Sequence, residues 1–391
     1  MDYFDVFSTA ELLFTGAALA MFVVQVLYYR ITYMRPWRVR AREGEGEGED
    51  GLPPVSVVVY ADNESSNLRA NLPLLLNQDY PQYEVIVVND GSTDESDEVL
   101  KLLENEYPHL YHTFIPQESK YLSRRKLSLT IGIKAAKNDI LLFTEATCSP
   151  LTNQWLRSVA RNYTADTAIV LGFCAYRTGN GFFHKLVSYD NLLSGVQCIS
   201  AALIRRPYSG SGKNLSYRKS LFYEYKGYSH TLALHAGDDD LFVNEFAKGD
   251  NTKAEYTRDG IMSMSAYDNF AAWREMKVSR ITTQSYFKGD RLMFYHAEKV
   301  SSALFLLSVI ALIVAGALAG NPETVIAGCL LYFILYIIKA LVWDKVATLL
   351  QQHSSFALLP FLEVAGLFVS LYIRVYRLFY RKSAYTFTIG K

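Results

Sequence analysis

The sequence predicts an α/β fold, in which a mixed sheet is flanked by helices, joined to one N-terminal and about three C-terminal transmembrane helices. Strand-like apolar runs alternate with helix-like segments through the middle of the chain, a pattern typical of sheets built from right-handed crossovers. Long apolar stretches lie near both ends of a chain that is 50% hydrophobic and only 20% charged, which indicates membrane helices.

The composition excludes several classes of protein. The 39 Lys and Arg residues balance the 39 Asp and Glu residues, so no general positive field attracts DNA or RNA. We therefore expect no nucleic-acid partner. None of the four cysteines belongs to a Cys-x-x-Cys pair, which excludes a zinc ribbon or a disulfide framework and fits a reducing compartment.

Four apolar segments are long enough to cross a bilayer, because about 20 residues of helix span a hydrocarbon core of ~30 Å. Leu12–Tyr29 and Val300–Asn321 contain no charged residue, and Thr324–Trp343 and Ser354–Ile373 contain one each. We predict an N-terminal transmembrane helix within residues 1–34 and a C-terminal membrane region, residues 290–391, with spans at about 300–321, 323–343 and 354–374.

The distribution of basic residues predicts the orientation in the membrane. Five arginines, Arg30, Arg35, Arg38, Arg40 and Arg42, directly follow the first span, so we expect a multi-pass protein of the inner (cytoplasmic) membrane with the middle of the chain in the cytoplasm. If all four segments cross the membrane, the basic residues after position 373 lie outside the cell, against the rule that basic residues stay on the cytoplasmic side. Alternatively, one C-terminal segment is re-entrant or lies along the interface, with Lys345–Ser354 as an amphipathic connector.

A globular domain is expected between the membrane segments, over residues 53–289. It follows a linker, residues 35–52, that is first basic and then an alternation of Gly and Glu, which buries nothing and is typical of a flexible tether. Within the domain the apolar, β-branched runs predict buried strands, and leucines at helical spacing predict helices. The strands are expected at Val55–Tyr60, Glu84–Val88 and Ile140–Thr144, and the helices at Asn67–Leu76, Asp94–Glu106 and Leu127–Ala136.

Acidic residues follow each of these three strands. Asn63 and Glu64 come after the first strand, Asp90 after the second, and Glu145 after the third. Ligands of open α/β sheets bind beyond the carboxyl ends of the strands. Each of these residues, taken alone, could instead form a turn or cap a helix. Together at one edge they favour a site for a nucleoside, or for a divalent cation held against a diphosphate.

A second acidic group, Asp238, Asp239 and Asp240, stands at the start of a further predicted helix. Such a group can cap the helix, or it can supply a general base whose pKa is set by its neighbours. The nearby sequence Gly210-Ser211-Gly212-Lys213 is not a phosphate-binding loop of the Walker type, because that motif requires glycine at 207 and Ser or Thr at 214.

From about Pro53 to Gly289 the chain resembles the family-2 glycosyltransferases with a GT-A (Rossmann-like) fold, particularly their bacterial membrane-anchored branch. The resemblance lies in PPVSVVVYADNE, LPLLLNQDYPQYEVIVVNDGSTDES, GIKAAKNDILLFTEATCSP, GSGKNLSYRKSLF and GDDDLFVNE. It implies an enzyme that moves a sugar, with inversion, from a nucleotide diphosphate sugar to a lipid-linked or saccharide acceptor at the cytoplasmic membrane face. The alternatives are a catalytically impaired nucleotide-sugar-binding scaffold in a polysaccharide assembly complex, and a processive polysaccharide synthase.

The resemblance also implies roles for individual residues. The donor-binding positions fall on Asn63, Glu64, Asp90, Glu145 and Lys126, the last of which follows Arg124 and Arg125. The cation-binding DxD motif reads Glu145-Ala146-Thr147, so a Mg²⁺ or Mn²⁺ ion is implied with Glu145 and Thr147 as its protein ligands, and threonine is the weaker of the two.

The implied catalytic residues lie later in the chain. Asp239 is the general base and Asp238 its companion, although the register of the three aspartates leaves Asp238 as the alternative base. Arg280 matches the arginine of the family's QxxRW motif, where a guanidinium neutralises the departing diphosphate. This motif lacks its glutamine and tryptophan here, which argues against a processive synthase.

Overall fold

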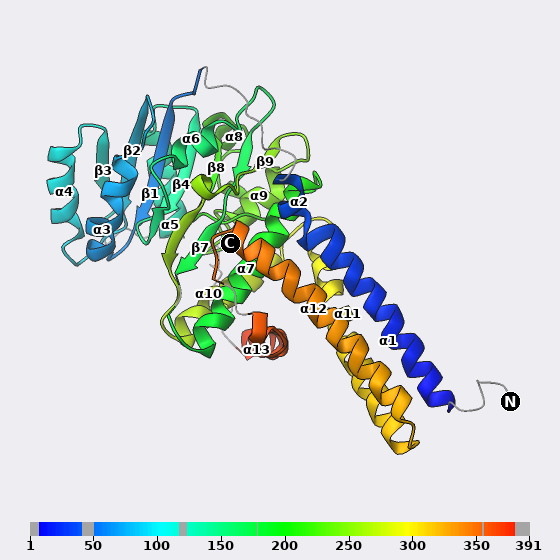
Figure 1. Cartoon of the computed structure of the whole chain (residues 1–391). Coiled ribbons are helices and arrows are strands. Elements are labelled where there is room, and N and C mark those ends of the chain that lie inside the picture. Colours follow the sequence, from blue (N-terminus) through cyan, green and yellow to red (C-terminus); the bar gives the residue numbers. More distant parts are fainter. Residues whose placement is uncertain (1–7, 41–50, 117–122, 178, 354–355, 380–391) are drawn as a thin grey trace.

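The computed structural model describes residues 8–40, 51–116, 123–177, 179–353 and 356–379. Most of the predicted linker therefore lies outside the described residues. A globular α/β domain stands at one end of a group of long helices, and the last long helix, α13 (Leu359–Phe379), lies to one side near the place where the other helices reach the domain (Figure 1).

The main sheet of the domain has seven strands in the order β3-β2-β1-β4-β8-β6-β9. Its first four strands are parallel, namely β1 (Val55–Ala61), β2 (Tyr83–Asn89), β3 (Leu110–Phe114) and β4 (Ile140–Glu145). The strand β8 (Leu215–Arg218) runs antiparallel to β4 and to β6 (Ile169–Leu171), which pairs in parallel with β9 (Thr252–Ala254). The predicted mixed sheet is confirmed.

Helices cover both faces of this sheet. They do so because successive side chains of a strand point to opposite faces, and both faces of β1 carry apolar side chains. Val57 and Val59 of β1 pack with the leucines of α3 (Ser65–Leu76) and α4 (Ser96–Glu106). Val58, between them, faces the other side and packs with α5 (Arg124–Ala135). Because the side-chain period of a strand is two, a continuous apolar run such as this one buries both of its faces.

A second, three-stranded sheet extends the domain toward the membrane helices. Its order is β5-β10-β7, with bounds Cys148–Pro150, Met262–Ser265 and Cys174–Arg177. The other helices of the domain are α6 (Trp155–Ala160), α7 (Phe182–Leu203), α8 (Lys219–Glu224), α9 (Asp240–Phe246) and α10 (Phe270–Gln284).

Four helices are long and apolar enough to cross a membrane, as predicted. They are α1 (Thr9–Tyr28, prolonged by a π-helical turn to Tyr33), α11 (Arg291–Leu318), α12 (Pro322–Leu349) and α13 (Leu359–Phe379). The short helix α2 (Arg35–Arg40) follows the first of them. Polar contacts join these helices: Gln25 donates to Ser301 at 2.8 Å, and Thr324 donates to Glu11 at 2.8 Å.

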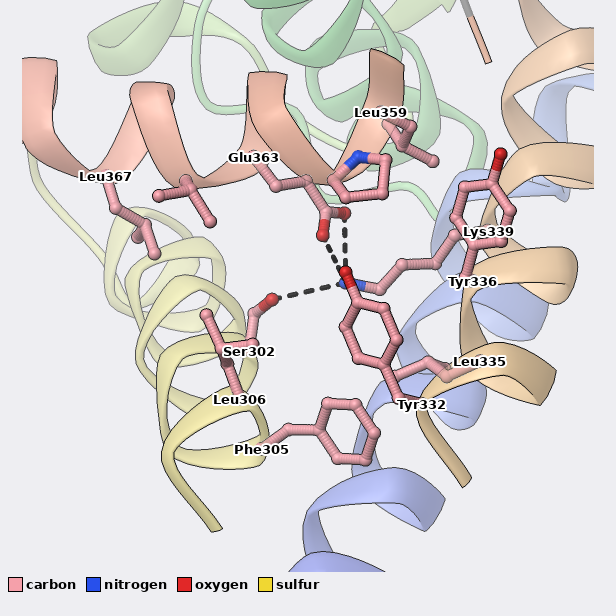
Figure 2. A pocket seen from close by; sticks show the side chains of 12 residues that line it. Ser302, Phe305, Leu306, Tyr332, Leu335, Tyr336, Lys339, Leu359, Glu363 and Leu367 are labelled. Carbon is pink, nitrogen blue, oxygen red and sulfur yellow. Dashed lines mark hydrogen bonds and ion pairs between the residues drawn. The ribbon is translucent and has the colours of Figure 1, made fainter. Parts of the chain in front are cut away.

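Helix α13 is arranged differently from the other three. Figure 1 shows α1, α11 and α12 side by side, whereas α13 is seen end-on where they reach the domain. It packs on α7 and α10, and its Glu363 forms an ion pair with Lys339 of α12 at 2.9 Å (Figure 2). Whether α13 crosses the membrane or lies along the interface therefore stays a prediction, since it is apolar and long enough to span but is oriented differently from the other three helices. The expected connector, in contrast, is partly wrong, because Lys345–Leu349 continues α12.

Candidate functional site

Strand register brings the predicted acidic residues to one edge of the main sheet. Tyr60 of β1 lies opposite Glu145 at the end of β4, and Ala61 lies opposite Asn89 at the end of β2. Asp90 is the next residue after β2. The carboxyl ends of three neighbouring parallel strands therefore present Asp90 and Glu145 on either side of β1, at the place where sheets of this kind bind ligands.

Asp90 is buried at this edge, with 5% of its surface exposed. Tyr60 donates a hydrogen bond to its Oδ2 at 2.9 Å, and the guanidinium of Arg124, at the start of α5, lies 2.7 Å from its Oδ1. Arg124 and Tyr60 thus fix the orientation of the Asp90 carboxylate. An oriented carboxylate favours a ligand whose hydrogen-bond donors match its geometry.

The loop after β1 is fastened to the loop after β2. Asn63 adopts a left-handed conformation with a φ of 54°, and its side-chain oxygen accepts a hydrogen bond from the Thr93 backbone at 2.8 Å. Its own backbone nitrogen donates to Ser92 at 2.8 Å. Glu64, beside it, accepts a hydrogen bond from Asn67. In the described chain Asn63 therefore shapes the edge, and Glu64 lies half-exposed next to it.

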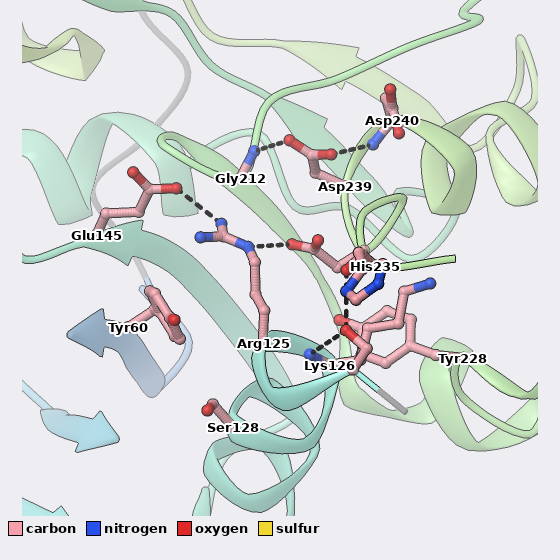
Figure 3. Close-up of polar contacts among 12 residues, drawn as sticks. Tyr60, Arg125, Lys126, Ser128, Glu145, Gly212, Tyr228, His235, Asp239 and Asp240 are labelled. Carbon is pink, nitrogen blue, oxygen red and sulfur yellow. Dashed lines mark hydrogen bonds and ion pairs between the residues drawn. The ribbon is translucent and has the colours of Figure 1, made fainter. Parts of the chain in front are cut away.

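Arg125 occupies the centre of the site (Figure 3). Its guanidinium lies 2.7 Å from Glu145 and 3.0 Å from Asp238, and its terminal carbon lies 4.8 Å from the centre of the Tyr60 ring. Burial favours the neutral form of Glu145, but the charges of Arg125 and Lys213 outweigh it and lower the pKa of this carboxyl. Arg125 thus links the strand edge to the acidic group before α9.

Lys126 does not contact the charged cluster of Arg125, Glu145 and Asp238, although the resemblance implied that this basic residue binds the sugar donor. It is 2% exposed, and its ammonium donates hydrogen bonds to the carbonyls of Thr231 and Leu234. Burial lowers its pKa to about 8, against the opposing effect of the nearby aspartates. Lys126 therefore fastens the segment that leads to α9, and the neighbouring Arg124 and Arg125 face the edge instead.

Asp239 caps the N-terminus of α9 and lies opposite Arg280 of α10. Its Oδ2 accepts hydrogen bonds from the Gly212 nitrogen at 2.8 Å and from Arg280 at 3.0 Å, and its Oδ1 accepts one from the Asp240 nitrogen at 2.6 Å. Burial acts to raise the pKa of Asp239, but Arg280 and these donors outweigh it and lower the pKa. The carboxylate is therefore charged and paired.

The other two aspartates have different surroundings. Asp238 pairs with Arg125, as described above, whereas Asp240 is 1% exposed and accepts a hydrogen bond from Thr283. Burial and the neighbouring charge of Asp239 raise the pKa of Asp240 to about 7. Three consecutive carboxylates thus form a chain of alternating charges with two arginines, and only Asp239 contacts both the glycine loop at 210–213 and Arg280.

The comparisons with known proteins agree with this geometry. Residues 56–228 match the family model described as glycosyl transferase family 2. This segment is a family-2 glycosyltransferase domain. Glycosyltransferase AglE of Haloferax volcanii is 34% identical over 134 residues, which are 33% of this chain and 42% of the relative. A beta-monoglucosyldiacylglycerol synthase of Nostoc is 35% identical over 108 residues, 27% of this chain and 21% of the relative. The chain thus spans less than half the length of these relatives.

A solved structure shows the same fold for most of the chain. The mannosyltransferase PcManGT from Pyrobaculum calidifontis, in complex with GDP-Man and Mn²⁺, superposes with a TM-score of 0.54 at 16% identity. The match covers 88% of this chain and 99% of that one. The family-2 domain therefore has the GT-A fold, as predicted.

The family-2 domain offers few ligands to a divalent cation. Thr147, in the turn after β4, contacts the Cys148 sulfur at 3.8 Å and hydrogen-bonds to no carboxylate in the described part of the chain, while Glu145 is already paired with Arg125. Among the described residues no group of three or more His, Cys, Asp or Glu side chains is arranged to hold a metal ion. Glu145 fits such an ion only as one ligand of a site completed by phosphate oxygens, which Mg²⁺ commonly accepts.

Lys213, in the loop that faces Asp239, is a further cation that sequence reasoning missed. Its ammonium donates to the Tyr176 hydroxyl at 2.9 Å and lies 5.4 Å from the centre of the Tyr267 ring. Burial acts to lower its pKa, but the surrounding hydroxyls and Glu145 outweigh burial and raise it, so Lys213 stays charged. The only signal in the sequence was a lysine beside two glycines.

Proposed function

We propose that the protein is an inverting glycosyltransferase that moves a sugar from a nucleotide diphosphate sugar to an acceptor at the cytoplasmic face of the inner membrane. One observation supports this most strongly: Arg125 joins the acidic strand edge to the aspartates before α9, where Arg280 pairs with Asp239. A site of this kind can receive a polyanionic donor on its arginines and keep a separate carboxylate for the acceptor.

The donor occupies the strand edge in this proposal. Asp90, oriented by Tyr60 and Arg124, accepts hydrogen bonds from the nucleoside. The diphosphate lies toward Arg125 and Lys213, whose positive charges stabilise it. Glu145 would hold a Mg²⁺ or Mn²⁺ ion, which when bound supplies further positive charge to the diphosphate. GDP-Man and Mn²⁺, present with the mannosyltransferase of similar fold, define the donor class and the cation to test first.

The transfer step uses Asp239 as general base. Its carboxylate takes the proton of an acceptor hydroxyl, and the acceptor oxygen forms a bond to the anomeric carbon. The bond between that carbon and the diphosphate oxygen breaks on the opposite face, which inverts the configuration and releases the nucleotide diphosphate. In the described structure Arg280 neutralises Asp239. A bound diphosphate competes for this guanidinium and so frees the carboxylate to act as a base.

The membrane region makes a lipid-linked acceptor the first candidate. Helix α13 packs directly on α7 and α10, so the acceptor side of the site adjoins the apolar helices. One relative is named for a glucosyl lipid, which agrees with this choice. The proposed orientation rests on the basic residues after α1, such as Arg35 and Arg38. Arg377 of α13 agrees with it, because this residue donates a hydrogen bond to the Ile281 carbonyl of α10 in the domain.

A binding scaffold without transfer activity is the second candidate, because the cation motif has lost one carboxylate and Arg125 neutralises the other. A single experiment separates the two. Purified full-length protein is incubated with UDP-, GDP- and dTDP-sugars, and thermal stabilisation and donor hydrolysis are measured. The enzyme is expected to be stabilised by one nucleotide class and to release its diphosphate slowly. Stabilisation without release in any cation would favour the scaffold, and no stabilisation by any of the donors would contradict both.

A further inference from the structure

Two adjoining hollows lie where α13 meets the membrane helices. The first lies between α11, α12 and α13 (Figure 2). The second is lined mainly by α7, α10, α11 and α13. Ser302, Glu363 and Leu367 line both of them, so the two hollows adjoin.

The first hollow is mainly apolar. Its walls include Phe305 and Leu306 of α11 and Leu335 of α12, all on helices apolar enough to cross a membrane. The ion pair between Lys339 and Glu363 borders it on the side of α13 (Figure 2). The apolar walls of this hollow suit the acyl chain of a lipid. The ion pair marks the edge at which the apolar lining ends.

The second hollow also has mainly apolar walls, but more charged side chains line it, and their charges balance. Two lysines, Lys277 and Lys299, and three carboxylates, Asp190, Glu298 and Glu363, line it. The third carboxylate, Glu363, is neutralised by a lysine of the first hollow. A phosphate would require an excess of positive charge, which this lining lacks. Alternating donors and acceptors beside an indole instead suit an uncharged headgroup that carries hydroxyls.

One buried hydrogen-bond donor in this hollow lacks a partner. Trp273 is 1% exposed, and its indole nitrogen is buried without a hydrogen bond to any described residue. Buried donors are rarely left without an acceptor, and a ligand oxygen in the hollow would satisfy the indole.

Helix α10 connects this hollow to the proposed base. Trp273 and Lys277 line the hollow, and Arg280, three residues beyond Lys277, pairs with Asp239. Three residues advance a helix by about 4.5 Å, and residues at this spacing lie on the same face. A headgroup in the second hollow is therefore about one helical turn from the arginine that holds Asp239.

We infer that the two hollows together form the acceptor site for a lipid with an uncharged, hydroxyl-bearing headgroup. The tail lies between α11, α12 and α13, and the headgroup lies among Trp273, Lys277 and Lys299 with a hydroxyl directed toward Asp239. This inference rests on the proposed glycosyl transfer and names the chemical class of its acceptor.

Photolabelling tests the site in the full-length protein. The protein is placed in phosphatidylcholine nanodiscs with a diacylglycerol that carries a diazirine in one acyl chain, and cross-linked peptides are identified after irradiation. We expect labels on the lining of the first hollow, including Phe305 and Leu335. Ser302→Trp fills the junction of the hollows and should reduce labelling at least about tenfold, because the indole occupies the volume that the lipid needs.

Matched controls make the result specific. Ser308→Trp lies on the same helix but lines neither hollow, and labelling should remain as in the natural sequence. Unlabelled diacylglycerol should compete with the probe, whereas phosphatidic acid should not. Labels confined to bilayer-facing residues such as Leu307, or equal labelling of both tryptophan variants, would overturn the inference. Competition by phosphatidic acid alone would overturn the headgroup assignment.

Donor binding is measured in the same samples, so the two proposals fail separately. Ser302→Trp should keep the thermal stabilisation by a nucleotide sugar, since Asp90 and Arg125 lie on the distant strand edge. Stabilisation by donor with no labelling of the hollows would refute the lipid site and leave the transferase proposal standing. Labelling of the hollows without any response to donors would refute the transferase proposal and support a lipid site alone.

Discussion

Replacing Arg125 with glutamine tests whether this residue holds the site together. The substitution removes one guanidinium that lies 2.7 Å from Glu145 and 3.0 Å from Asp238. The Asp238 side chain is only 4% exposed, so the variant leaves a buried carboxylate without its partner. Removing one partner of a buried ion pair costs about 3–5 kcal/mol. Glu145 keeps Lys213 nearby and adds less.

Thermal unfolding in one detergent, followed by circular dichroism, measures this loss. A destabilisation of that size lowers Tm by about 6–20 °C for a domain of this size. The matched control is Arg69→Gln, because Arg69 pairs with Glu95 on the surface, where both side chains are more than half exposed, and exposed pairs contribute little. A decrease no larger than that of the control would refute the coupling of charges described here.

The effect of pH gives a second check on the same variant. The pKa of Glu145 is lowered in the folded protein, so the stability that its pairing contributes is fully present above its ordinary value of 4.5. That contribution is lost as the pH falls through the lowered folded value. The part of the Arg125→Gln deficit that comes from Glu145 should therefore be complete at pH 7 and should shrink at pH values below about 4.5. A deficit that grows in acid would contradict the assigned direction.

Three further predictions follow from the site and the topology. Asp90→Ala removes a charge-assisted hydrogen bond to the nucleoside, so isothermal titration should show nucleotide affinity weaker by about 1.5–3 kcal/mol, and unchanged affinity in a folded variant would make Asp90 a turn residue only. Cation binding should be weak without donor and should tighten in Thr147→Asp, whereas equal transfer in the presence of a chelator would contradict the cation site. A cysteine introduced within residues 43–51 should stay unlabelled in intact cells, and ready labelling from outside would reverse the orientation.

The sequence predicted three of the four parallel strands because their signal is local, whereas β3 (Leu110–Phe114) was not predicted. Apolar β-branched runs such as Val55–Tyr60 read directly as buried strands, and the acidic residues after them meet at one edge, as expected for parallel neighbours. The short strands β6, β8 and β9 were not predicted. They have three or four residues each and depend on pairing with distant segments, which no local pattern reports.

The side chains of the site were harder to predict than its position. Three basic residues in a row open α5, and helical geometry sends Arg124 and Arg125 to the strand edge while Lys126 turns into the interior. The sequence alone does not fix the rotation of α5 about its axis, because side chains on both sides of this helix are buried. It therefore does not tell which of the three basic residues faces the strand edge. The course of α13 was likewise ambiguous, because its apolar length fits either a span or a helix lying along the interface.

Transfer by the Asp239→Asn variant tests the central claim most directly. The donor class found by the stabilisation screen is incubated with full-length protein in lipid nanodiscs, and sugar transfer and nucleotide affinity are measured on the same preparation, with Asp238→Asn beside it. Loss of the general base should reduce the rate by about 10²–10⁴-fold and leave nucleotide affinity nearly unchanged, because Asp239 does not hold the nucleotide. Near-normal transfer by Asp239→Asn together with an inactive Asp238→Asn would move the base by one residue, and near-normal transfer by both variants would contradict the proposed mechanism.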